Sequence, residues 1–456
     1  MRLPRLRLTH ALAAVALGVY ALLVVGATTA LTDAATACPT WPACGGQWFD
    51  VSSLSLAVVW AHRTVAALVG VALVVTAALA VRVGAERRVL AALALALVLY
   101  PVQVVVGAVA ATADVAPVPM LHLALGVAIF GGVALALAWR LESQTASEPS
   151  AEWEGAPKGG DAGDAPAADG PLATVRAYVA LTKPRLMWLL CLVAAAGMAL
   201  AAGPDLSART VAFTLLGGVL SIGASGTFNH VFEREKDKKM DRTADRPVAT
   251  DRIPKRNAFA FGLLLAAASL LAFSRVGLLA TGLGLVAIGF YSVVYTLLLK
   301  PNTVQNTVIG GAAGALPALI GWAAVTGTLE APALALAGVI FLWTPAHFYN
   351  LALAYRDDYA AGGFPMMPVV RGAAETRKHI VVWLAATLVG AAVLAAVSGL
   401  GWLYASTVVA VGAVFLWAVV RLHYERDRTA AMRAFHASNA FLGAALVAVV
   451  VDAMLL

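Results

Sequence analysis

The chain has 456 residues, of which 61% are hydrophobic and only 12% are charged, and its formal net charge is +7. Soluble domains carry about 25% charged residues, so this composition excludes an ordinary soluble protein. Apolar runs of about 20 residues recur along the chain, and each is long enough to cross a hydrocarbon core about 30 Å thick. A transmembrane barrel would instead show shorter, alternating segments. The sequence therefore predicts an all-α polytopic membrane protein surrounded by lipid.

We expect about 13 transmembrane helices, four before and nine after a long polar segment. Their approximate ranges are 9–31, 54–80, 89–112, 120–139, 184–203, 209–232, 257–275, 277–299, 304–326, 331–354, 378–400, 402–420 and 434–455. Only Ser274 and Arg275 separate the seventh helix from the eighth, so this is the least marked division.

The distribution of Lys and Arg between the loops predicts how the chain lies in the cell membrane. Basic residues occur in the N-terminal stretch MRLPRLR and in the loops near 81–88, 233–256, 355–377 and 421–433. The alternate loops contain neither Lys nor Arg, and they lie near 32–53, 113–119, 327–330 and 398–401. We therefore expect a cytoplasmic N-terminus and an external C-terminus. The net positive charge reflects this bias and gives little support to nucleic-acid binding.

The first four spans contain two histidines at a similar depth. His62 and His122 lie near the outer ends of the second and fourth spans, where an inward-facing pair could ligate a heme iron axially. The alternative is that both histidines only pack. Cys38 and Cys44 lie on the exterior loop, where five intervening residues permit a disulfide in an oxidising compartment. Metal binding by these cysteines is the less favoured alternative, and Cys191 is expected only to pack.

Residues 1–140 resemble one four-helix half of heme A synthase. The similarity lies in CPTWPACGG, the His62-Arg63 pair, YPVQVVVGAVAAT and MLHLALG. The complete enzyme has two such halves, and Val59 stands where an acidic residue needed for activity is common. The resemblance thus implies a module that binds heme or hands it over, and leaves open whether it oxidises anything. It also implies a heme A synthase or cytochrome oxidase assembly proteins as candidate partners.

The composition changes abruptly after Arg140. Residues 141–171 are rich in Ala, Gly and Pro, and residues 141–170 carry seven carboxylates against one Lys. Such a segment cannot bury enough apolar area to fold, so we expect a flexible cytoplasmic linker. It divides a four-helix domain, residues 1–140, from a nine-helix domain, residues 172–456, and keeps the two at high local concentration.

In the second domain, NHVFEREKDKKMDRTADRP (residues 229–247) begins at the end of the span 209–232 and continues out of the membrane on the predicted cytoplasmic side. If the helix continues, Asn229, Glu233 and Asp237 fall at i, i+4 and i+8 and share one face. Their oxygens suit Mg²⁺, which is usually held by one or two carboxylates and completes its shell with water and substrate phosphate. Arg242 and Arg246, also four apart, can add bidentate contacts to phosphate oxygens.

A second polar cluster, YRDDY, ends another span on the same predicted membrane face. It contains Asp357 and Asp358, and LTKPR brings Lys183 and Arg185 to that face as well. Two acidic clusters with basic residues between them suit a diphosphate bridged by metal ions, which would stabilise it as a leaving group. The alternative is a set of solvated loops that serve only as positive-inside signals. The residues alone indicate a membrane enzyme or carrier for a phosphorylated ligand.

The stretch from Asn229 to Pro247 resembles the Asn-xxx-Asp-xxx-Asp motif of the UbiA-type intramembrane prenyltransferases, with Glu233 where Asp is usual. Its continuation Met-x-Arg-Thr-x-x-Arg-Pro, together with 295–322 and 343–370, is similar to the protoheme IX farnesyltransferase (heme O synthase) subfamily. This resemblance covers about residues 172–456. It implies a nine-helix UbiA-type bundle that transfers a farnesyl group from farnesyl diphosphate to the vinyl group of heme B.

The same resemblance implies a set of site residues. The catalytic and Mg²⁺-binding positions are Asn229, Glu233, Asp237, Asp357 and Asp358. The substrate-binding positions are Lys183, Arg185, Arg242, Arg246, Lys300 and Tyr359. Asn306 and His347 are further substrate-binding candidates, because polar residues within membrane spans are costly unless used, and His347 could equally be a structural hydrogen-bonding residue. Two other functions stay open, a prenyltransferase for an aromatic quinone precursor and a non-catalytic membrane heme carrier or sensor.

Overall fold

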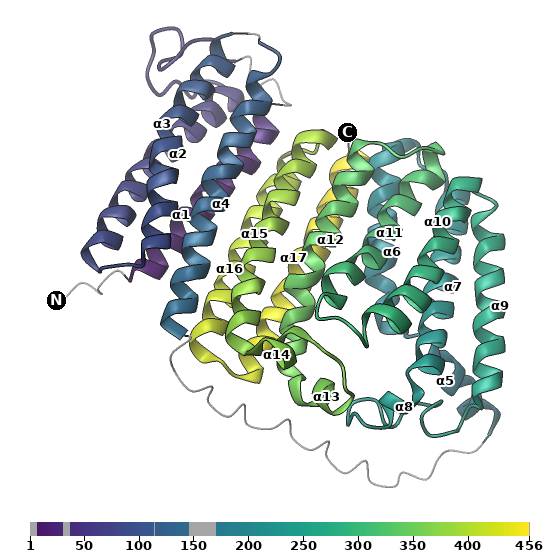
Figure 1. Ribbon diagram of the computed structural model, residues 1–456. Coiled ribbons are helices and arrows are strands. Elements are labelled where there is room, and N and C mark those ends of the chain that lie inside the picture. The colour runs from purple at the N-terminus through teal and green to yellow at the C-terminus, as the bar shows by residue number, and fades with distance from the viewer. Residues whose placement is uncertain (1–6, 31–36, 114, 146–169, 456) are drawn as a thin grey trace. The chain divides into compact units, whose positions relative to one another are not determined.

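The computed structural model describes residues 7–30, 37–113, 115–145 and 170–455, and every named element within them is a helix (Figure 1). Thirteen of these helices are long and apolar enough to cross a membrane, as the sequence predicts. The division between the seventh and eighth spans is confirmed, because α9 ends at Phe273 and α10 begins at Leu278 after Gly277, which has φ +138°. The chain is a multi-pass membrane protein.

The contacts between residues group the chain into two compact units, Met1–Pro149 with Arg377–Tyr424, and Ser150–Thr376 with Glu425–Leu456. The first unit contains α1 (Leu8–Ala30), α2 (Leu54–Arg82), α3 (Arg87–Thr112), α4 (Val118–Thr145), most of α15 (Gly372–Ser398) and nearly all of α16 (Trp402–Glu425). The expected grouping into four and nine helices is therefore not reproduced by the contacts. Within the first unit, Tyr20 of α1 donates to the carbonyl of Val408 in α16, and Lys378 of α15 pairs with Glu142 of α4 at 2.8 Å.

The second unit holds the remaining helices. These are α5 (Pro171–Leu181), α6 (Pro184–Ala202), η1 (Gly203–Asp205), α7 (Ala208–Phe232), α8 (Arg234–Asp237), α9 (Lys255–Phe273), α10 (Leu278–Gly289), η2 (Phe290–Leu299), α11 (Asn306–Thr326), α12 (Ala331–Ala354), α13 (Arg356–Ala361), α14 (Met367–Val370) and α17 (Arg428–Leu455). In this unit α7 packs along α9, and α11 packs along both α6 and α12. The short helices α8, α13 and α14 lie together at one end (Figure 1).

The predicted linker begins later than the sequence suggested. Residues 141–145 belong to α4, where Thr145 Oγ1 donates to the carbonyl of Leu141 at 2.8 Å. Glu142 stabilises this last turn because it also pairs with Arg88 at 3.0 Å. Residues 146–169, the rest of the predicted linker apart from Gly170 and Pro171, lie outside the described residues.

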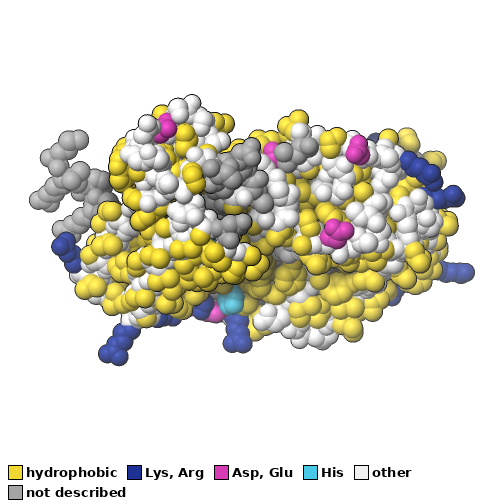
Figure 2. Space-filling view, turned by 90° about the horizontal axis from the view of Figure 1, so that it is seen from above, with side chains coloured by type: hydrophobic (Ala, Val, Ile, Leu, Met, Phe, Trp, Pro, Cys, Tyr) yellow, Lys and Arg dark blue, Asp and Glu magenta, His cyan; other side chains and the backbone are white. Residues whose placement is uncertain are grey.

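The surface is that of a protein in lipid rather than in water. Figure 2 shows an end face dominated by apolar and uncharged side chains, with isolated acidic groups on it and Lys and Arg side chains mainly at its margin. Along the helices, large apolar side chains such as Leu68, Leu95 and Leu264 are 64%, 55% and 66% exposed. In the absence of a hydrophobic drive between helices, close approach of backbones must contribute to holding such a bundle together.

The crossing of α6 and α11 is the tightest such approach. A Cβ atom built at Gly197 would collide with the carbonyl oxygen of Ala318, and one at Gly321 would collide with that of Ala194. The two contacts are reciprocal, so both glycines are needed for the two backbones to touch. Because the obstacle is backbone, neither collision can be relieved by a side-chain rotation.

We expect Gly321→Ala to destabilise the protein by about 1–3 kcal/mol, since overpacking would force α6 and α11 apart. Gly338→Ala in α12 is the matched control, because a Cβ atom there meets no atom within 4 Å. Thermal unfolding of the detergent-solubilised variants measures the effect. An unfolding temperature for Gly321→Ala that equals or exceeds the control would contradict this account of the helix crossing.

Candidate active site

The predicted column of oxygen ligands survives a break in its helix. Helix α7 ends at Phe232, and Glu233 takes φ −93° and ψ 3° before the short α8 begins. Even so, the amide of Glu233 donates to the carbonyl of Asn229 at 2.9 Å, and the amide of Asp237 donates to that of Glu233 at 2.8 Å. The spacing of four residues is therefore kept although the helix is not continuous.

Buried polar groups of this column are paired with cations from elsewhere in the chain. Lys183 donates to Oδ1 of Asn229, and Lys300 binds Oε1 of Glu233 at 2.6 Å. Glu233 is only 4% exposed and Asn229 only 2%. Lys183 reaches this position because its backbone adopts the left-handed conformation, φ 53°, in the turn between α5 and α6. Such a conformation is uncommon for a residue with a side chain and often marks a functional position.

Asp237 completes the set of pairs. Both of its carboxylate oxygens accept from Nη1 of Arg246, at 2.8 and 2.9 Å, and it is 1% exposed. The hydroxyl of Thr243 donates to its carbonyl oxygen at 3.0 Å, which folds the following loop back over the cluster. A buried carboxylate needs such a partner, because removing an unpaired charge from water costs several kcal/mol.

The electrostatics of the cluster are set by burial and by charges in close contact. Burial lowers the pKa of the Lys183 ammonium to about 7, and Arg246 adds to this effect. Burial alone would raise the pKa of Glu233, but Lys300 and Lys183 outweigh it and lower the pKa. For Asp237, burial raises the pKa in spite of Arg246. The cations are therefore crowded and partly desolvated, a setting in which an additional anion would be favourable.

A π-helix supplies the opposite wall of the cluster. Element η2 has wide turns, in which the amide of Lys300 donates to the carbonyl of Tyr295 five residues earlier. Thr296 Oγ1 accepts from Nδ2 of Asn229 at 3.4 Å, and the ring of Tyr291 lies 5.9 Å from the ammonium of Lys183. Segments of π-helix are rare and are frequent at functional sites.

The second acidic cluster meets the first from α13. Asp358 accepts from the backbone amides of Asp241 and Arg242, at 3.1 and 3.4 Å, and lies 3.8 Å from Nε of Arg242. It therefore fastens the loop after α8 to α13. Asp357 is exposed at the same end. Nη2 of Arg242 also lies 3.4 Å from the hydroxyl of Tyr359, a residue that is largely buried.

An apolar cavity opens beside this cluster. The space between its walls, including space open to the surroundings, is about 760 Å³, and the walls come from α6, α7, α10, η2 and α11, with Phe273 from the end of α9. Lys183, Gly226 and Tyr291 line the end nearest the ion pairs. On α7 the lining extends from Gly226 to Thr214, twelve residues or about 18 Å of helix, more than half of a hydrocarbon core. A slot of this shape suits a long apolar chain with an anionic head.

The comparison with known families fits this geometry. Residues 189–444, more than half of the chain, match the model of the UbiA prenyltransferase family. The chain belongs to the UbiA prenyltransferase family. Protoheme IX farnesyltransferase of Halobacterium salinarum (strain R1) is 66% identical over 449 residues, 97% of each chain. Protoheme IX farnesyltransferase 1 of Saccharopolyspora erythraea is 45% identical over 280 residues, 60% of this chain and 89% of that protein.

Among solved structures, that of digeranylgeranylglyceryl phosphate synthase has a TM-score of 0.53 and 14% identity, and covers 62% of this chain and 99% of that chain. At this identity the likeness shows the shared fold alone. Membership of the family makes this chain a prenyltransferase, as the resemblance of its motifs indicates.

Among the residues predicted for the UbiA-type site, Lys183 is the one that lines the described cavity, and three others are part neither of the cavity lining nor of the ion-pair cluster. Asn306 donates to the carbonyl of Thr303 at 2.6 Å at the start of α11, and Arg185 is exposed at the start of α6. His347 stacks between the rings of Trp343 and Phe435, with centroids 4.2 and 4.3 Å away. Its Nδ1 lies 2.6 Å from Oγ of Ser438, so the geometry favours the structural alternative for His347.

Sequence reasoning missed several polar and aromatic groups at the cluster. His230 is 4% exposed, its two ring nitrogens have no hydrogen-bond partner within the described structure, and Lys183 and Arg246 are close enough to interact with it electrostatically. The ring of Phe364 lies 4.3 Å from Nζ of Lys236 and 4.4 Å from Nζ of Lys300. The only available signal for His230 was its place beside Asn229 at the end of a span.

The oxygen donors fit a divalent metal ion, although the described residues contain no group of three or more His, Cys, Asp or Glu side chains that could hold one. Mg²⁺ needs only one or two carboxylates when phosphate and water complete its shell. Glu233 and Asp237 provide buried carboxylates one turn apart, and their present partners are cations that could bind phosphate instead. The chemistry of the donor set therefore suits Mg²⁺ together with a diphosphate.

The N-terminal histidines lie between the helices of the first unit. His62 and His122 are close enough to interact electrostatically, and the Nδ1 atom of each has no hydrogen-bond partner within the described residues. The ring of His122 packs against α3, where its Nε2 lies 3.3 Å from Nε2 of Gln103 and a Cβ atom at Gly107 would come within 2.7 Å. The two histidines predicted to act together are thus neighbours.

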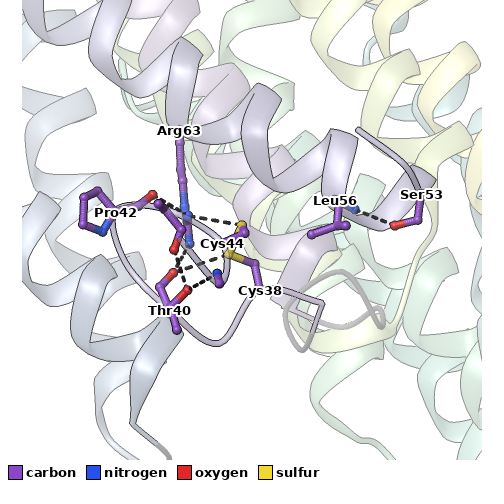
Figure 3. The surroundings of a disulfide bond; sticks show 9 residues. Cys38, Thr40, Pro42, Cys44, Ser53, Leu56 and Arg63 are labelled. Carbon is purple, nitrogen blue, oxygen red and sulfur yellow. Dashed lines mark hydrogen bonds between the residues drawn. A yellow bond between two sulfur atoms is a disulfide. The ribbon is translucent and has the colours of Figure 1, made fainter. Parts of the chain in front are cut away.

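The exterior loop is closed by a bond between Cys38 and Cys44 (Figure 3). Arg63, next to His62 on α2, reaches into this loop and donates to the carbonyls of Pro42 and Thr40 at 2.8 and 3.0 Å. The loop is thereby fixed to the helix that carries His62.

We expect Lys300→Met to destabilise the protein by about 3–5 kcal/mol, because it leaves the carboxylate of Glu233 buried without a partner. The double variant Glu233→Gln with Lys300→Met should recover most of this loss. Asp251→Asn is the control, since Asp251 pairs with Arg234 at an exposed site, where ion pairs contribute little. Equal unfolding temperatures for Lys300→Met and Asp251→Asn would argue against a role for the buried pair.

Proposed function

We propose that this protein is a heme O synthase. It transfers the farnesyl group of farnesyl diphosphate to a vinyl group of heme B and releases diphosphate. The observation that carries this proposal is the double position of Lys183, which lines the apolar cavity and also binds Asn229 in the ion-pair cluster. A substrate with an anionic head and a long apolar tail would engage both at once.

The choice of acceptor is supported by the relatives named Protoheme IX farnesyltransferase. One of them aligns with only 60% of this chain, so the activity in its name does not need a protein of this length. The prenyl-transfer chemistry is therefore assigned to the part of the chain that matches the UbiA prenyltransferase family, residues 189–444.

The cations of the cluster would stabilise the leaving group. Lys183, Lys300 and Arg246 are held beside the cavity mouth by Asn229, Glu233 and Asp237. When a diphosphate enters, these cations can contact its oxygens without large movement. They then stabilise the negative charge that grows as the bond between C1 of the farnesyl chain and the diphosphate oxygen breaks, with the electron pair staying on that oxygen.

Glu233 and Asp237, with Asn229 beside them, would hold Mg²⁺ together with the diphosphate. Bound Mg²⁺ would add positive charge beside the leaving diphosphate. The residues of the second cluster have separate tasks: Asp358 holds the loop that carries Arg242 and Arg246, and the exposed Asp357 remains available as a second carboxylate. The cluster thus positions ligands that no single helix could supply.

The rest of the reaction takes place in an apolar setting. The allylic cation at C1 is attacked by the terminal carbon of the vinyl group, which forms the new carbon–carbon bond and leaves a cation next to the porphyrin ring. The oxygen of a water molecule adds to that cation and releases a proton to solvent. The apolar cavity walls protect the allylic cation from water until the vinyl group has reacted.

The N-terminal helices are proposed to bind heme through His62 and His122 and to pass it on. Their unpaired Nδ1 atoms and close approach support a ligand between them. We do not propose that this module oxidises heme, because Val59 stands where the heme A synthase resemblance leads one to expect an acidic residue needed for activity. We also propose that the α8 and α13 end of the second unit faces the cytoplasm, because its loops are rich in Lys and Arg.

Purified protein supplied with heme B, farnesyl diphosphate and Mg²⁺ tests the proposed activity. A farnesylated, hydrated heme detected by mass spectrometry supports heme O synthase. Prenylation of an added hydroxybenzoate in place of heme would point to a quinone-precursor prenyltransferase. Tight heme binding without turnover would point to a carrier or sensor.

We expect Asp237→Asn to lower prenyl transfer by about 100-fold or more, because it removes a charged oxygen ligand beside the leaving group. Protein expression and membrane insertion should persist. Asp251→Asn, an exposed carboxylate in the same loop region, is the control and should keep wild-type turnover. Wild-type turnover in Asp237→Asn would remove this carboxylate from the catalytic machinery.

For the N-terminal module, we expect His62→Ala to abolish the low-spin absorption of heme reconstituted into the full chain. His10→Ala in α1 is the control, since His10 is exposed and should leave the spectrum unchanged. An unchanged spectrum in His62→Ala would exclude His62 as an axial ligand.

A further inference from the structure

An aromatic ring forms part of the wall near the far end of the apolar cavity, where the lining on α7 continues about one turn further, to Thr214. Phe273, the last residue of α9, lines the cavity and is 0% exposed. Its ring is wedged between two helices: a Cβ atom at Gly217 of α7 would lie 2.7 Å from it, and one at Gly284 of α10 would lie 2.5 Å from it. The ring therefore has no room to turn toward either helix.

A hydrogen bond between α9 and α7 also holds the helix that carries the ring in place. Ser269, one turn earlier in α9, donates from Oγ to the carbonyl of Gly217 at 2.7 Å and is 0% exposed. This bond ties α9 to α7 at the level of the ring. Phe273 is thus a rigid part of the wall near the far end of the cavity and not a mobile side chain that a ligand could displace at low cost.

The ring of Phe273 lies at a definite depth below the cavity mouth, which is the end nearest the ion pairs. Gly217 precedes Gly226 by nine residues on α7, which corresponds to about 14 Å at 1.5 Å per residue. Gly284 precedes Tyr291 by seven residues on the neighbouring segment, about 10 Å. Gly226 and Tyr291 line the mouth together with Lys183. A chain whose diphosphate binds at the mouth would therefore meet the ring within about 10–14 Å.

We infer that Phe273 sets the length of the isoprenoid chain that this protein accepts. The inference rests on the proposed prenyl transfer and extends it to substrate choice. Isoprenoid diphosphates share one head group and differ only in repeated apolar units, so hydrogen bonds cannot tell them apart. Selection among them has to be steric, and a rigid ring at the end of the slot excludes the longer chain by overlap.

The test is a competition between geranyl, farnesyl and geranylgeranyl diphosphates with heme B as acceptor, with products separated by mass spectrometry. Phe273→Ala should raise the ratio of geranylgeranylated to farnesylated heme at least ten-fold. Gly284→Ala should push the ring into the cavity and shift the ratio the other way, toward geranylated heme. Opposite shifts from two variants cannot arise from a general loss of stability.

Phe228→Ala is the matched control. Phe228 is on α7 and packs against α9, where a Cβ atom at Gly262 would lie 2.7 Å from its ring, but it is not part of the cavity lining. Phe228→Ala removes the same number of atoms as Phe273→Ala and should leave the product ratio unchanged. If Phe273→Ala does not accumulate as folded protein, Phe273→Leu is used and should shift the ratio in the same direction, by a smaller factor.

Two failures are distinguishable. An unchanged product ratio in the Phe273 variant, with a wild-type protein that makes farnesylated heme, overturns the inference and leaves the proposed function intact. A wild-type protein that makes no prenylated heme overturns the proposed function. In that case the relative binding of the three diphosphates to wild type and Phe273→Ala still decides whether the ring limits chain length, and equal relative binding would overturn the inference.

Discussion

The pairing of buried carboxylates with cations at the mouth of an apolar cavity is the constraint on which the rest of this structure depends. Glu233 and Asp237 are almost completely buried at the end of a membrane helix, where an unpaired charge would be too costly to retain. Lys300 and Arg246 make that burial possible. We propose that the same two cations bind the diphosphate of the substrate. Folding and substrate binding therefore use one set of charges.

This double use explains the irregular backbone around the cluster. Lys183 arrives through a left-handed turn, Glu233 sits in a break between α7 and α8, and Lys300 follows a π-helix. Each irregularity aims a charged side chain at a point that a regular helix would miss. Unusual conformations cost free energy, and they persist where surrounding contacts compensate for them, as the ion pairs do here.

The sequence predicts those parts of the structure that depend on local pattern. Hydropathy places all thirteen spans, and the spacing of Asn229, Glu233 and Asp237 predicts their stacking, because both follow from helix geometry alone. The partners of these residues lie far away in the chain: Lys300 is 67 residues from Glu233. No periodicity reports such a contact, so the sequence could identify candidate cations but not pair them.

The same reasoning accounts for contacts that the sequence did not predict. Asn306 and His347 were selected because polar residues in membrane spans are costly unless used, but both meet that cost with ordinary hydrogen bonds, to Thr303 and Ser438. The contact grouping of α15 and α16 with the N-terminal helices depends on surfaces whose hydropathy is like that of any span facing lipid. Composition cannot separate a helix that packs on protein from one that packs on lipid.

The ion-pair cluster at the mouth of the cavity and the ring of Phe273 near its far end are proposed to act together in substrate selection. The ring of Phe273 can select the length of an isoprenoid chain only if the diphosphate end of that chain is held at a fixed point. In the proposed mechanism the crowded cations supply that point, since they would bind the diphosphate at one place and burial gives them little freedom to follow it elsewhere. Lys183 joins the two functions, because it is part of both the ion-pair cluster and the cavity lining. A change that loosened the ion pairs would therefore be expected to blur chain-length selection as well as to slow the reaction, although no residue near Phe273 had been altered.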